Sequence, residues 1–444
     1  MVLKSNAIAN NPIKIFLFLT FILISLFFLF FLVFFYTSST TTQNQLSSIQ
    51  AASLYHPNSF KVYVADLPRS LNYGLFEKYW SSGHPDSRIP SDPDHQIPGS
   101  HPPRPTKYPP YPENPLIKQY SAEYWILGDL ETPEEMRTVS FAKRVFDVEE
   151  ADVVFVPFFA TLSGEMQLGS GNGAFRKKEG NEDSLRQKEV LDFVRNTDAW
   201  KRSGGRDHVF VFTDPVVMWH VRAEIALAVL LVVDFGGWYK LDSNSLNVST
   251  SDVMMHHTQV SLLKDAIVPY THLLPRLQLS DDQECHTLLL YFKGAKHWHR
   301  GGLVREKLWD LLVGEPGIVM EEVFCIPVIV SDNIELPFEG MIDYSEFSVF
   351  VAVSDALISN WLVTYLRSIP ARQRDEFRRN MAKFQPIFEY ASGHPGGVGP
   401  IPPDGAVNHI WKKVHQKLPA IKEAIIRDKR KPAGVPIPLR CHCT

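Results

Sequence analysis

A basic, glycine-containing loop joins a predicted strand to a predicted helix in the second half of the chain. The strand covers 287–292 and the helix 303–312, and Lys293, Arg300 and Arg305 lie at and after the turn between them. Glycines let a backbone approach a phosphate, and the amino end of a helix presents N–H donors. The three cations can therefore neutralise a diphosphate leaving group. The spacing matches no Walker or dinucleotide fingerprint, so a solvated basic loop is the alternative.

Acidic residues follow the next predicted strand, 326–330. Asp332, Glu335 and Glu339 lie on the loop that begins there. Ligands of open parallel sheets bind outside the carboxyl ends of the strands, where an acidic residue commonly holds ribose hydroxyls. The pattern predicts that Asp332 and Glu335 bind the ribose of a nucleotide donor. The alternative is that these carboxylates cap the following helix and meet water.

Carboxylates and a histidine surround a predicted strand of the first half, 208–213. Asp207, Asp214 and His220 are expected to cluster about the end of this strand. Asp, Glu or His can take a proton from an acceptor hydroxyl, so these three are candidates for a catalytic base, with a structural role as the alternative. Tyr120 and Glu123 are expected to shape the same region or to serve as turn and packing residues.

The sequence predicts no metal cofactor. The histidine pairs His256-His257 and His297-x-His299 lack a third ligand with accompanying carboxylates. Asp92-Pro93-Asp94 is formally an Asp-x-Asp element, but it lies in a proline-rich loop and not at a strand end.

Apolar runs alternate with helical stretches along most of the chain. The predicted strands are 60–68, 151–157, 208–213, 287–292, 317–322 and 326–332, and the predicted helices are 120–130, 184–200, 303–312, 372–384 and 406–427. Such alternation is typical of α/β proteins with a parallel sheet covered on both faces. We expect two Rossmann-like domains that face a cleft.

The two strands 317–322 and 326–332 follow one another almost without connection. Parallel strands need a crossover of a dozen or more residues, usually a helix. The residues between Glu322 and Cys325 provide no such crossover. The sequence therefore predicts that the second domain lacks a strand–helix unit at this junction.

Composition and the first sixty residues bound the class of protein. The 444 residues carry a formal net charge of -4, without the basic excess that nucleic-acid binding needs. From Ile15 to Tyr36 the chain is apolar and uncharged, long enough to cross a bilayer, and it is preceded by Lys4 and Lys14. A polar tract follows, and Asn247 begins a glycosylation sequon.

These observations predict six segments. They are a cytosolic tail (1–14), a transmembrane signal-anchor (15–36), a lumenal stem (37–58), an acceptor domain (59–258), an incomplete nucleotide-sugar domain (259–430) and a C-terminal tail (431–444). A short anchor, a stem and a lumenal body are the layout of Golgi type II enzymes. We therefore expect a single-pass protein of the Golgi membrane with its body in the lumen.

Several strings together resemble the plant exostosin-like proteins of glycosyltransferase family 47, and among them the arabinosyltransferase group (ARAD-type). The resemblance runs from about residue 60 to the C-terminus and rests on segments 62–68, 205–210, 214–215, 264–270, 292–294 and 326–332. It implies a GT-B-type fold and an inverting transfer of a sugar from a nucleotide donor without a bound metal. Family members carry some tens of additional residues at the junction, which contribute much of their donor pocket.

The resemblance implies transfer of arabinosyl from a UDP-sugar to pectic arabinan, a cell-wall polysaccharide. Because the residues that contribute to the donor pocket are missing at the junction, the alternative is a weak or inactive protein. Such a protein would bind glycan or scaffold other transferases in the lumen. Hydrolysis is the third alternative and ranks last, because it needs a pair of carboxylates across a cleft and the sequence alone places no such pair. The sequence leaves open whether the chain forms homo-oligomers or hetero-oligomers with other transferases.

Overall fold

The structure is a computed structural model, and it describes fifteen ranges of the chain. These are residues 60–81, 107–112, 114–168, 179–214, 217–233, 239–240, 254–255, 261–271, 290–291, 302–312, 318–319, 326–332, 334–390, 397–430 and 432. The chain divides into two units, Met1–His56 and Pro57–Thr444. The predicted tail, anchor and stem (1–58) and the sequon at Asn247 lie outside the described residues. Within the described ranges, no helix has the length and apolar character needed to cross a membrane.

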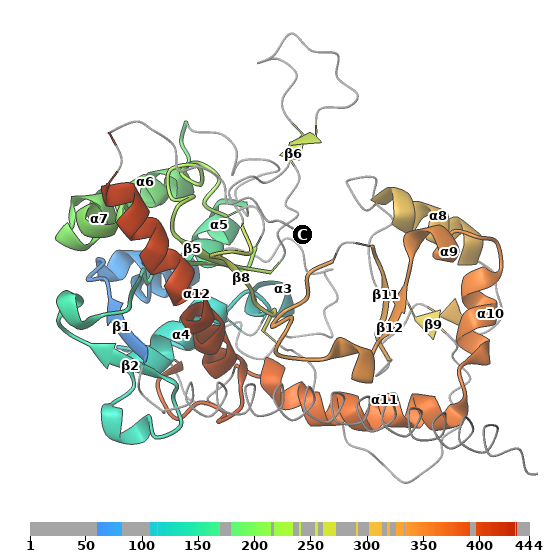
Figure 1. Ribbon diagram of the computed structural model, residues 1–444. Coiled ribbons are helices and arrows are strands. Elements are labelled where there is room, and N and C mark those ends of the chain that lie inside the picture. The colour runs from blue at the N-terminus through green and yellow to red at the C-terminus, as the bar shows by residue number, and fades with distance from the viewer. Residues whose placement is uncertain are drawn as a thin grey trace, which may run out of the picture. The chain divides into compact units, whose positions relative to one another are not determined.

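A six-stranded parallel sheet organises the first half of the chain (Figure 1). Its strands in spatial order are β2 (Ala142–Val145), β1 (Phe60–Val64), β3 (Val153–Phe155), β4 (His208–Phe212), β5 (Val229–Val232) and β8 (Ala266–Ile267). Every residue of β3, β4 and β5 is buried, as expected for parallel strands covered on both faces. The expected α/β class and parallel sheet are confirmed, and they fit a Rossmann-like fold of GT-B type.

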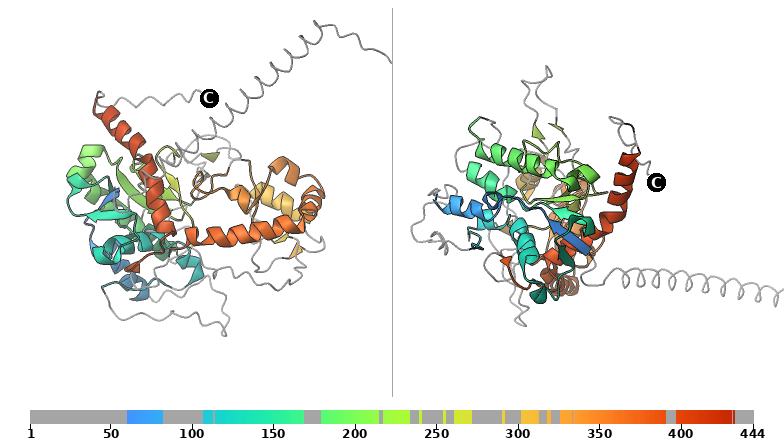
Figure 2. Two further views of the ribbon diagram at one scale, coloured as in Figure 1. Left: turned by 60° about the horizontal axis from the view of Figure 1, so that its bottom comes forward. Right: turned by 90° about the vertical axis from the view of Figure 1, so that its left-hand side faces the viewer.

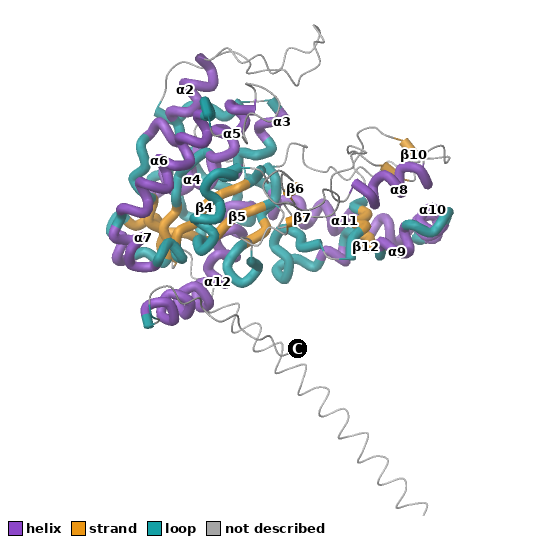
Figure 3. The backbone as a smooth tube through the Cα atoms, turned by 90° about the horizontal axis from the view of Figure 1, so that it is seen from above, coloured by secondary structure: helices purple, strands orange, loops and turns teal. Residues whose placement is uncertain are grey.

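Helices cover both faces of this sheet, and the alternation of side chains along β3 shows which lie opposite each other. Phe155 packs its ring 6.0 Å from that of Trp411 in α12 (Ala406–Lys429), whereas its neighbour Val154 clusters with Ala199 of α7 (Asp198–Ser203). Successive strand residues point to opposite faces, so α12 and α7 cover opposite faces. Figure 2 shows the two helices on either side of the strands, and Figure 3 shows β4 and β5 among α4, α5 and α6.

The remaining helices of the first half follow from local capping and apolar content. They are α2 (Gly74–Ser81), α3 (Pro115–Lys118), α4 (Ala122–Glu131), α5 (Ala160–Leu168) and α6 (Glu182–Asn196), with 3-10 turns at Arg69–Leu71, Glu134–Met136 and Val148–Glu150. Asn181 caps α6 by accepting the Ser184 N–H at 2.8 Å. α7 ends at Gly204, which adopts the left-handed φ of 63° that glycine tolerates.

A second, smaller region contains short parallel pairs. β9 (Leu290–Tyr291) pairs with β10 (Ile318–Val319), and β11 (Val328–Val330) pairs with β12 (Val349–Val351); a further antiparallel pair joins β6 (Tyr239–Lys240) to β7 (Met254–Met255). The helices are α8 (Gly302–Leu312), α9 (Val353–Ala356), α10 (Trp361–Ser368) and α11 (Ala371–Phe384), with 3-10 turns at Tyr344–Glu346 and Gln385–Phe388. Val349, Val351, Leu362 and Leu366 form its core. All three residues of β11 are only half-buried, unlike the strands of the large sheet.

The loop between β11 and β12 and the last part of the chain pack on the first sheet. Phe338 of that loop, and Tyr390 and Trp411 of the last part, belong to the core of the first sheet. The Tyr390 hydroxyl donates to the Pro269 carbonyl oxygen at 2.8 Å. β8 pairs with β5, so the first sheet extends past the predicted domain boundary between residues 258 and 259. The division into acceptor and nucleotide-sugar domains stays a prediction, and the short apolar run of β8 gives little local signal of its pairing with β5.

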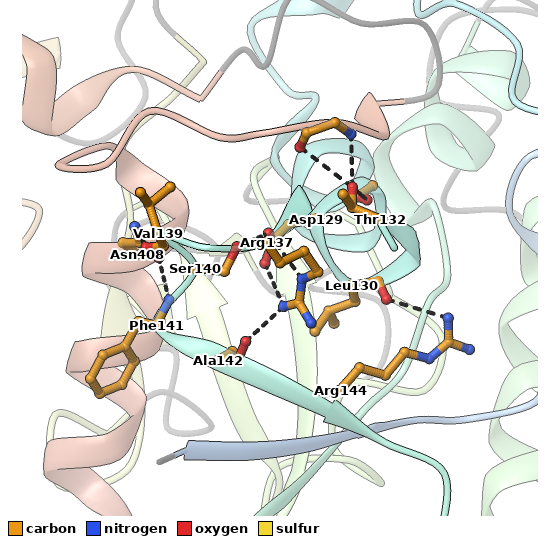
Figure 4. A network of polar contacts seen from close by, with 12 residues as sticks. Asp129, Leu130, Thr132, Arg137, Val139, Ser140, Phe141, Ala142, Arg144 and Asn408 are labelled. Carbon is orange, nitrogen blue, oxygen red and sulfur yellow. Dashed lines mark hydrogen bonds and ion pairs between the residues drawn. The ribbon is translucent and has the colours of Figure 1, made fainter. Parts of the chain in front are cut away.

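A buried ion pair fastens α4 to the edge strand β2 (Figure 4). Arg137 Nη2 lies 3.0 Å from Asp129 Oδ2 and also donates to the Ala142 carbonyl oxygen at 2.7 Å. The Ser140 hydroxyl donates to Asp129 Oδ1 at 2.6 Å. The side chains of the pair are 5% and 1% exposed, so both charges depend on each other and on these hydrogen bonds. Asn408 Oδ1 of α12 accepts the backbone N–H of Phe141, which directly precedes β2, at 2.7 Å.

Two glycines allow a close approach between α4 and the loop before α12. A Cβ built on Gly128 would lie 2.4 Å from the Gly397 carbonyl group. Gly397 itself has a φ of 67°, and Thr132 accepts the Gly399 N–H at 2.7 Å. Gly397 and Gly399 therefore pack closely against the end of α4.

Replacing Gly128 with Ala is expected to lower the free energy of unfolding by about 1–3 kcal/mol, because the new methyl group meets backbone that cannot yield. The sign opposes helix propensity, which alone favours Ala over Gly by about 0.5–1 kcal/mol. The urea midpoint of the full-length chain measures the change. Gly164→Ala in α5 is the matched control, because its Cβ would meet only side-chain atoms, Val217 Cγ1 at 3.4 Å and Asp183 Oδ2 at 4.0 Å. Equal effects of the two substitutions would contradict the packing argument.

Candidate functional site

Loops that follow the parallel strands meet at one edge of the large sheet, because the carboxyl ends of parallel strands share an edge. Thr213 follows β4, Thr161 lies in the first turn of α5 after β3, and Thr271 follows β8. α4 begins beside them: the Ser121 hydroxyl lies 3.0 Å from Thr271 Oγ1. The Thr271 N–H donates to the Gln119 carbonyl oxygen at 2.8 Å. These contacts bring four separate segments of the chain to the carboxyl edge.

Glu123 is the buried acid at this edge, with 1% of its surface exposed. Its Oε1 accepts the Thr161 N–H at 3.3 Å, and its Oε2 lies 3.3 Å from Thr213 Oγ1. Burial raises the pKa of Glu123 to about 8, although hydrogen bonds with the backbone and with Thr161 and Thr213 act in the opposite direction. We call Glu123, Thr161, Thr213 and Asp214 the carboxyl-edge cluster.

Asp214 directly follows Thr213, and 8% of its surface is exposed to solvent. Its carbonyl oxygen accepts the Val217 N–H at 3.3 Å. The next residue, Met218, is buried with a φ of 57°, a left-handed value that is uncommon for a side chain of this size. Strained backbone of this kind clusters at functional sites. The guanidinium of Arg222 lies 5.3 Å from the centre of the Phe212 ring, at the same end of β4.

Comparison with known proteins identifies the family. The model of the exostosin GT47 domain matches residues 56–324 and 322–368, well over half of the chain. This chain belongs to the exostosin GT47 family. It is also 29% identical over 409 residues to the probable arabinosyltransferase ARAD1 of Arabidopsis thaliana, in a comparison that covers 83% of this chain and 81% of that protein. The GT47 protein is accordingly a glycosyltransferase, and its resemblance to the ARAD-type group is confirmed.

The two matched segments of this GT47 protein meet at residues 322–324. This is the junction at which the sequence predicts a missing strand–helix unit. Because 83% of 444 residues is about 369, the 409 positions compared with ARAD1 include about 40 without a counterpart in this chain. Glu322 and Cys325 themselves lie outside the described residues.

His220 lies on the loop after β4, against the amino end of α6. Its backbone N–H donates to Gln187 Oε1 at 3.0 Å, and its Nε2 lies 3.4 Å from Asn181 Nδ2. Burial raises the pKa of Asp183, which His220 partly offsets by its charge. Asp183 also accepts the Ser163 hydroxyl at 2.7 Å. The described contacts of His220 thus join it to a structural network on α5 and α6.

Asp207 is not at the carboxyl end of β4, so the expectation that it lies with Asp214 is wrong. It precedes β4, and the six residues of nearly extended chain between Asp207 and Asp214 separate their backbones by roughly 20 Å. Burial would raise the pKa of Asp207, but the hydrogen bond and charge of His208, at 2.8 Å, leave it below the usual value. Asp207 also accepts the Ser203 hydroxyl at 2.6 Å. These contacts fix the turn between α7 and β4.

The predicted donor residues of the GT47 protein are only partly described. Asp332 Oδ1 accepts the Val353 N–H at 2.9 Å and so caps α9, which was the alternative to ribose binding. Glu335 lies near Lys413 and Lys417 of α12 and raises the pKa of both, although burial lowers each overall. Arg305 has its backbone in α8. Lys293, Arg300 and the Arg305 side chain lie outside the described residues.

Sequence reasoning missed the central place of Glu123. A signal existed in the sequence, because the run 122–130 has no charged residues apart from Glu123 and Asp129. In the structure all nine of these positions are buried, and an acid in such a helix must be neutral or paired. For metals, the described residues contain no group of three His, Cys, Asp or Glu side chains that could hold an ion. The expectation of a metal-free reaction stays a prediction.

Proposed function

We propose that this glycosyltransferase acts by inversion and transfers arabinosyl from a UDP-sugar to pectic arabinan, as a single-pass type II protein of the Golgi membrane. Membership of the GT47 family and the similarity to ARAD1 support the reaction class and the sugar. The predicted anchor at 15–36 and the stem that follows support the location. The observation that carries the proposal is the position of Asp214 at the carboxyl edge of a parallel sheet.

In the proposed mechanism, Asp214 accepts the proton of the acceptor hydroxyl. The hydroxyl oxygen then forms a bond to the anomeric carbon while the bond from that carbon to the diphosphate oxygen breaks, and UDP leaves with the electron pair. Lys293, Arg300 and Arg305 are proposed to neutralise the charge that grows on the diphosphate. No metal takes part in the proposed reaction.

The junction at residues 322–325 supports a second candidate, a weak or inactive protein that binds glycan or scaffolds other transferases. The divided family match and the half-burial of β11 favour the loss of a strand–helix unit there. A parallel strand without its neighbour leaves apolar surface in water. Reading transcripts across the codons for Val323 and Phe324 tests the junction, and an unbroken transcript without the additional residues would establish that the protein is made in this form.

Binding of the donor nucleotide separates the two candidates. The midpoint of thermal unfolding of the full-length chain is measured with and without UDP, with ADP as the control. A transferase with an intact pocket gains about 2.7 kcal/mol when UDP is at 100 times its dissociation constant, because the ligand binds only the native state. Release of UDP from UDP-arabinose with arabinan oligosaccharide is measured in parallel. A transition indifferent to UDP, without turnover, would favour the scaffolding protein.

A further inference from the structure

We propose that Glu123 is a positioning residue of the catalytic site, which holds Thr213, and through it Asp214, in place as an uncharged carboxylic acid. This inference rests on the proposed role of Asp214 as the base. It assigns to a buried side chain a function that depends on its proton, and not only on its volume.

A count of hydrogens around Thr213 supports an uncharged Glu123. The Thr213 hydroxyl has one hydrogen, and its oxygen lies 2.8 Å from the Tyr120 carbonyl oxygen. A carbonyl oxygen can only accept, so Thr213 donates to it. Glu123 Oε2, at 3.3 Å, is a second possible acceptor of the same hydrogen, and one hydrogen donated to Tyr120 cannot also serve Glu123. A carboxylate there would face a lone pair, whereas a protonated carboxyl donates to it.

The opposite oxygen of Glu123 is also used. Oε1 accepts the Thr161 N–H at 3.3 Å, and the Thr161 hydroxyl lies 3.3 Å from that of Thr213. One protonated carboxyl group therefore links the start of α5 to the end of β4. Since Asp214 follows Thr213 without an intervening residue, this link sets the direction in which the chain leaves the strand.

Burial outweighs the hydrogen bonds, from the backbone and from Thr161 and Thr213, that would favour a charged Glu123. The charge of Glu123 acts on the buried phenols of Tyr111 and Tyr390, and burial raises the pKa of both well above the usual value, so both are neutral. Ionisation of Glu123 would place a charge in buried surroundings, which is unfavourable.

The dependence on pH follows from the direction of the shift. Burial raises the pKa of Glu123 in the folded protein to about 8, above its ordinary value of 4.5. The folded state therefore holds this proton more tightly than the unfolded state does. The contribution of Glu123 to stability is complete below pH 4.5 and is lost as the pH rises through about 8. We expect that Asp214 is no longer held in place as the pH rises through about 8.

Glu123→Gln tests the inference, because the amide reproduces the protonated acid. Its NH₂ group can donate to Thr213 and its oxygen can accept from Thr161, but it cannot ionise. We expect Glu123→Gln to keep transfer activity at neutral pH within about threefold. We also expect it to abolish the fall in activity that is predicted for the native enzyme as the pH rises through about 8. Glu123→Met, of similar size without polar atoms, is expected to lower activity at every pH. Glu131→Gln, on the same helix, is the control and should keep the native profile.

Infrared spectroscopy of the full-length chain gives a readout that does not depend on activity. The native protein should show the carbonyl absorption of a protonated carboxylic acid at neutral pH, which disappears near pH 8 and is absent from Glu123→Gln. Absence of this band, or an unchanged alkaline fall in Glu123→Gln, would overturn the inference. If no protein transfers sugar at any pH, the proposed function fails, while the infrared band still decides whether Glu123 is protonated.

Discussion

Replacing Asp214 with Asn is expected to lower kcat/KM for transfer by about 10²–10⁴-fold, the contribution typical of a general base. Asn has the same shape but cannot take the proton of the acceptor hydroxyl. Asn can still accept hydrogen bonds through its amide oxygen, so the substitution should change the fold little. Activity is measured with UDP-arabinose and arabinan oligosaccharide, and binding of UDP is measured separately by thermal unfolding.

The matched control is Asp207→Asn, an identical substitution on the other end of the same strand. Asp207 accepts hydrogen bonds from Ser203 and His208, so its loss should lower stability and leave the activity of the folded protein within about threefold. Equal loss of activity in both variants would argue for a general effect on β4 and against Asp214 as the base. Unchanged activity of Asp214→Asn would exclude it as the base.

Replacing Arg137 with Met is expected to lower the free energy of unfolding by about 3–5 kcal/mol, because it leaves the charge of Asp129 buried without a partner. The loss also removes the hydrogen bond to the Ala142 carbonyl oxygen and so loosens β2 from α4 (Figure 4). Typical domains have a free energy of unfolding of about 5–15 kcal/mol, so this single change takes up much of the total. Urea unfolding measures it as a lower midpoint at unchanged slope.

Two comparisons make the Arg137 result specific. Lys143→Met on β2 breaks an exposed ion pair with Glu134, at 3.0 Å, and should cost at most about 1 kcal/mol. The double variant Arg137→Met with Asp129→Leu removes both buried charges and should recover much of the lost stability. If Lys143→Met and Arg137→Met lower the free energy of unfolding equally, burial does not explain the contribution of the Arg137–Asp129 pair to stability.

Local patterns were sufficient for β1, β3 and β4 of the first sheet, but they did not predict β2, β5 and β8. The runs 60–68, 151–157 and 208–213 were predicted from apolar content, and the structure places β1, β3 and β4 within them. The parallel class also followed, since near-continuous apolar runs alternate with helical stretches. β8 was not predicted, because two residues carry too little pattern to reveal a pairing with β5.

The candidate site was predicted only where its position depends on the nearest strand. Asp214 directly follows the predicted strand 208–213, so its place at the carboxyl edge is a local property. Asp207 is equally near in sequence, yet a strand has two ends and carboxylate chemistry does not tell them apart. Asp332 could hold a ribose or cap a helix by sequence, and its contact with the Val353 N–H favours the cap.

By itself the sequence determined the α/β class, the similarity to the GT47 family and the position of Asp214 after its strand, because apolar periodicity, family strings and strand ends are recorded in neighbouring residues. Only the tertiary structure decided the role of Glu123, whose neutrality depends on burial and on Thr161 and Thr213, which come from distant segments. The same holds for Arg137 and Asp129, since the strength of an ion pair depends on how much water the fold removes from it.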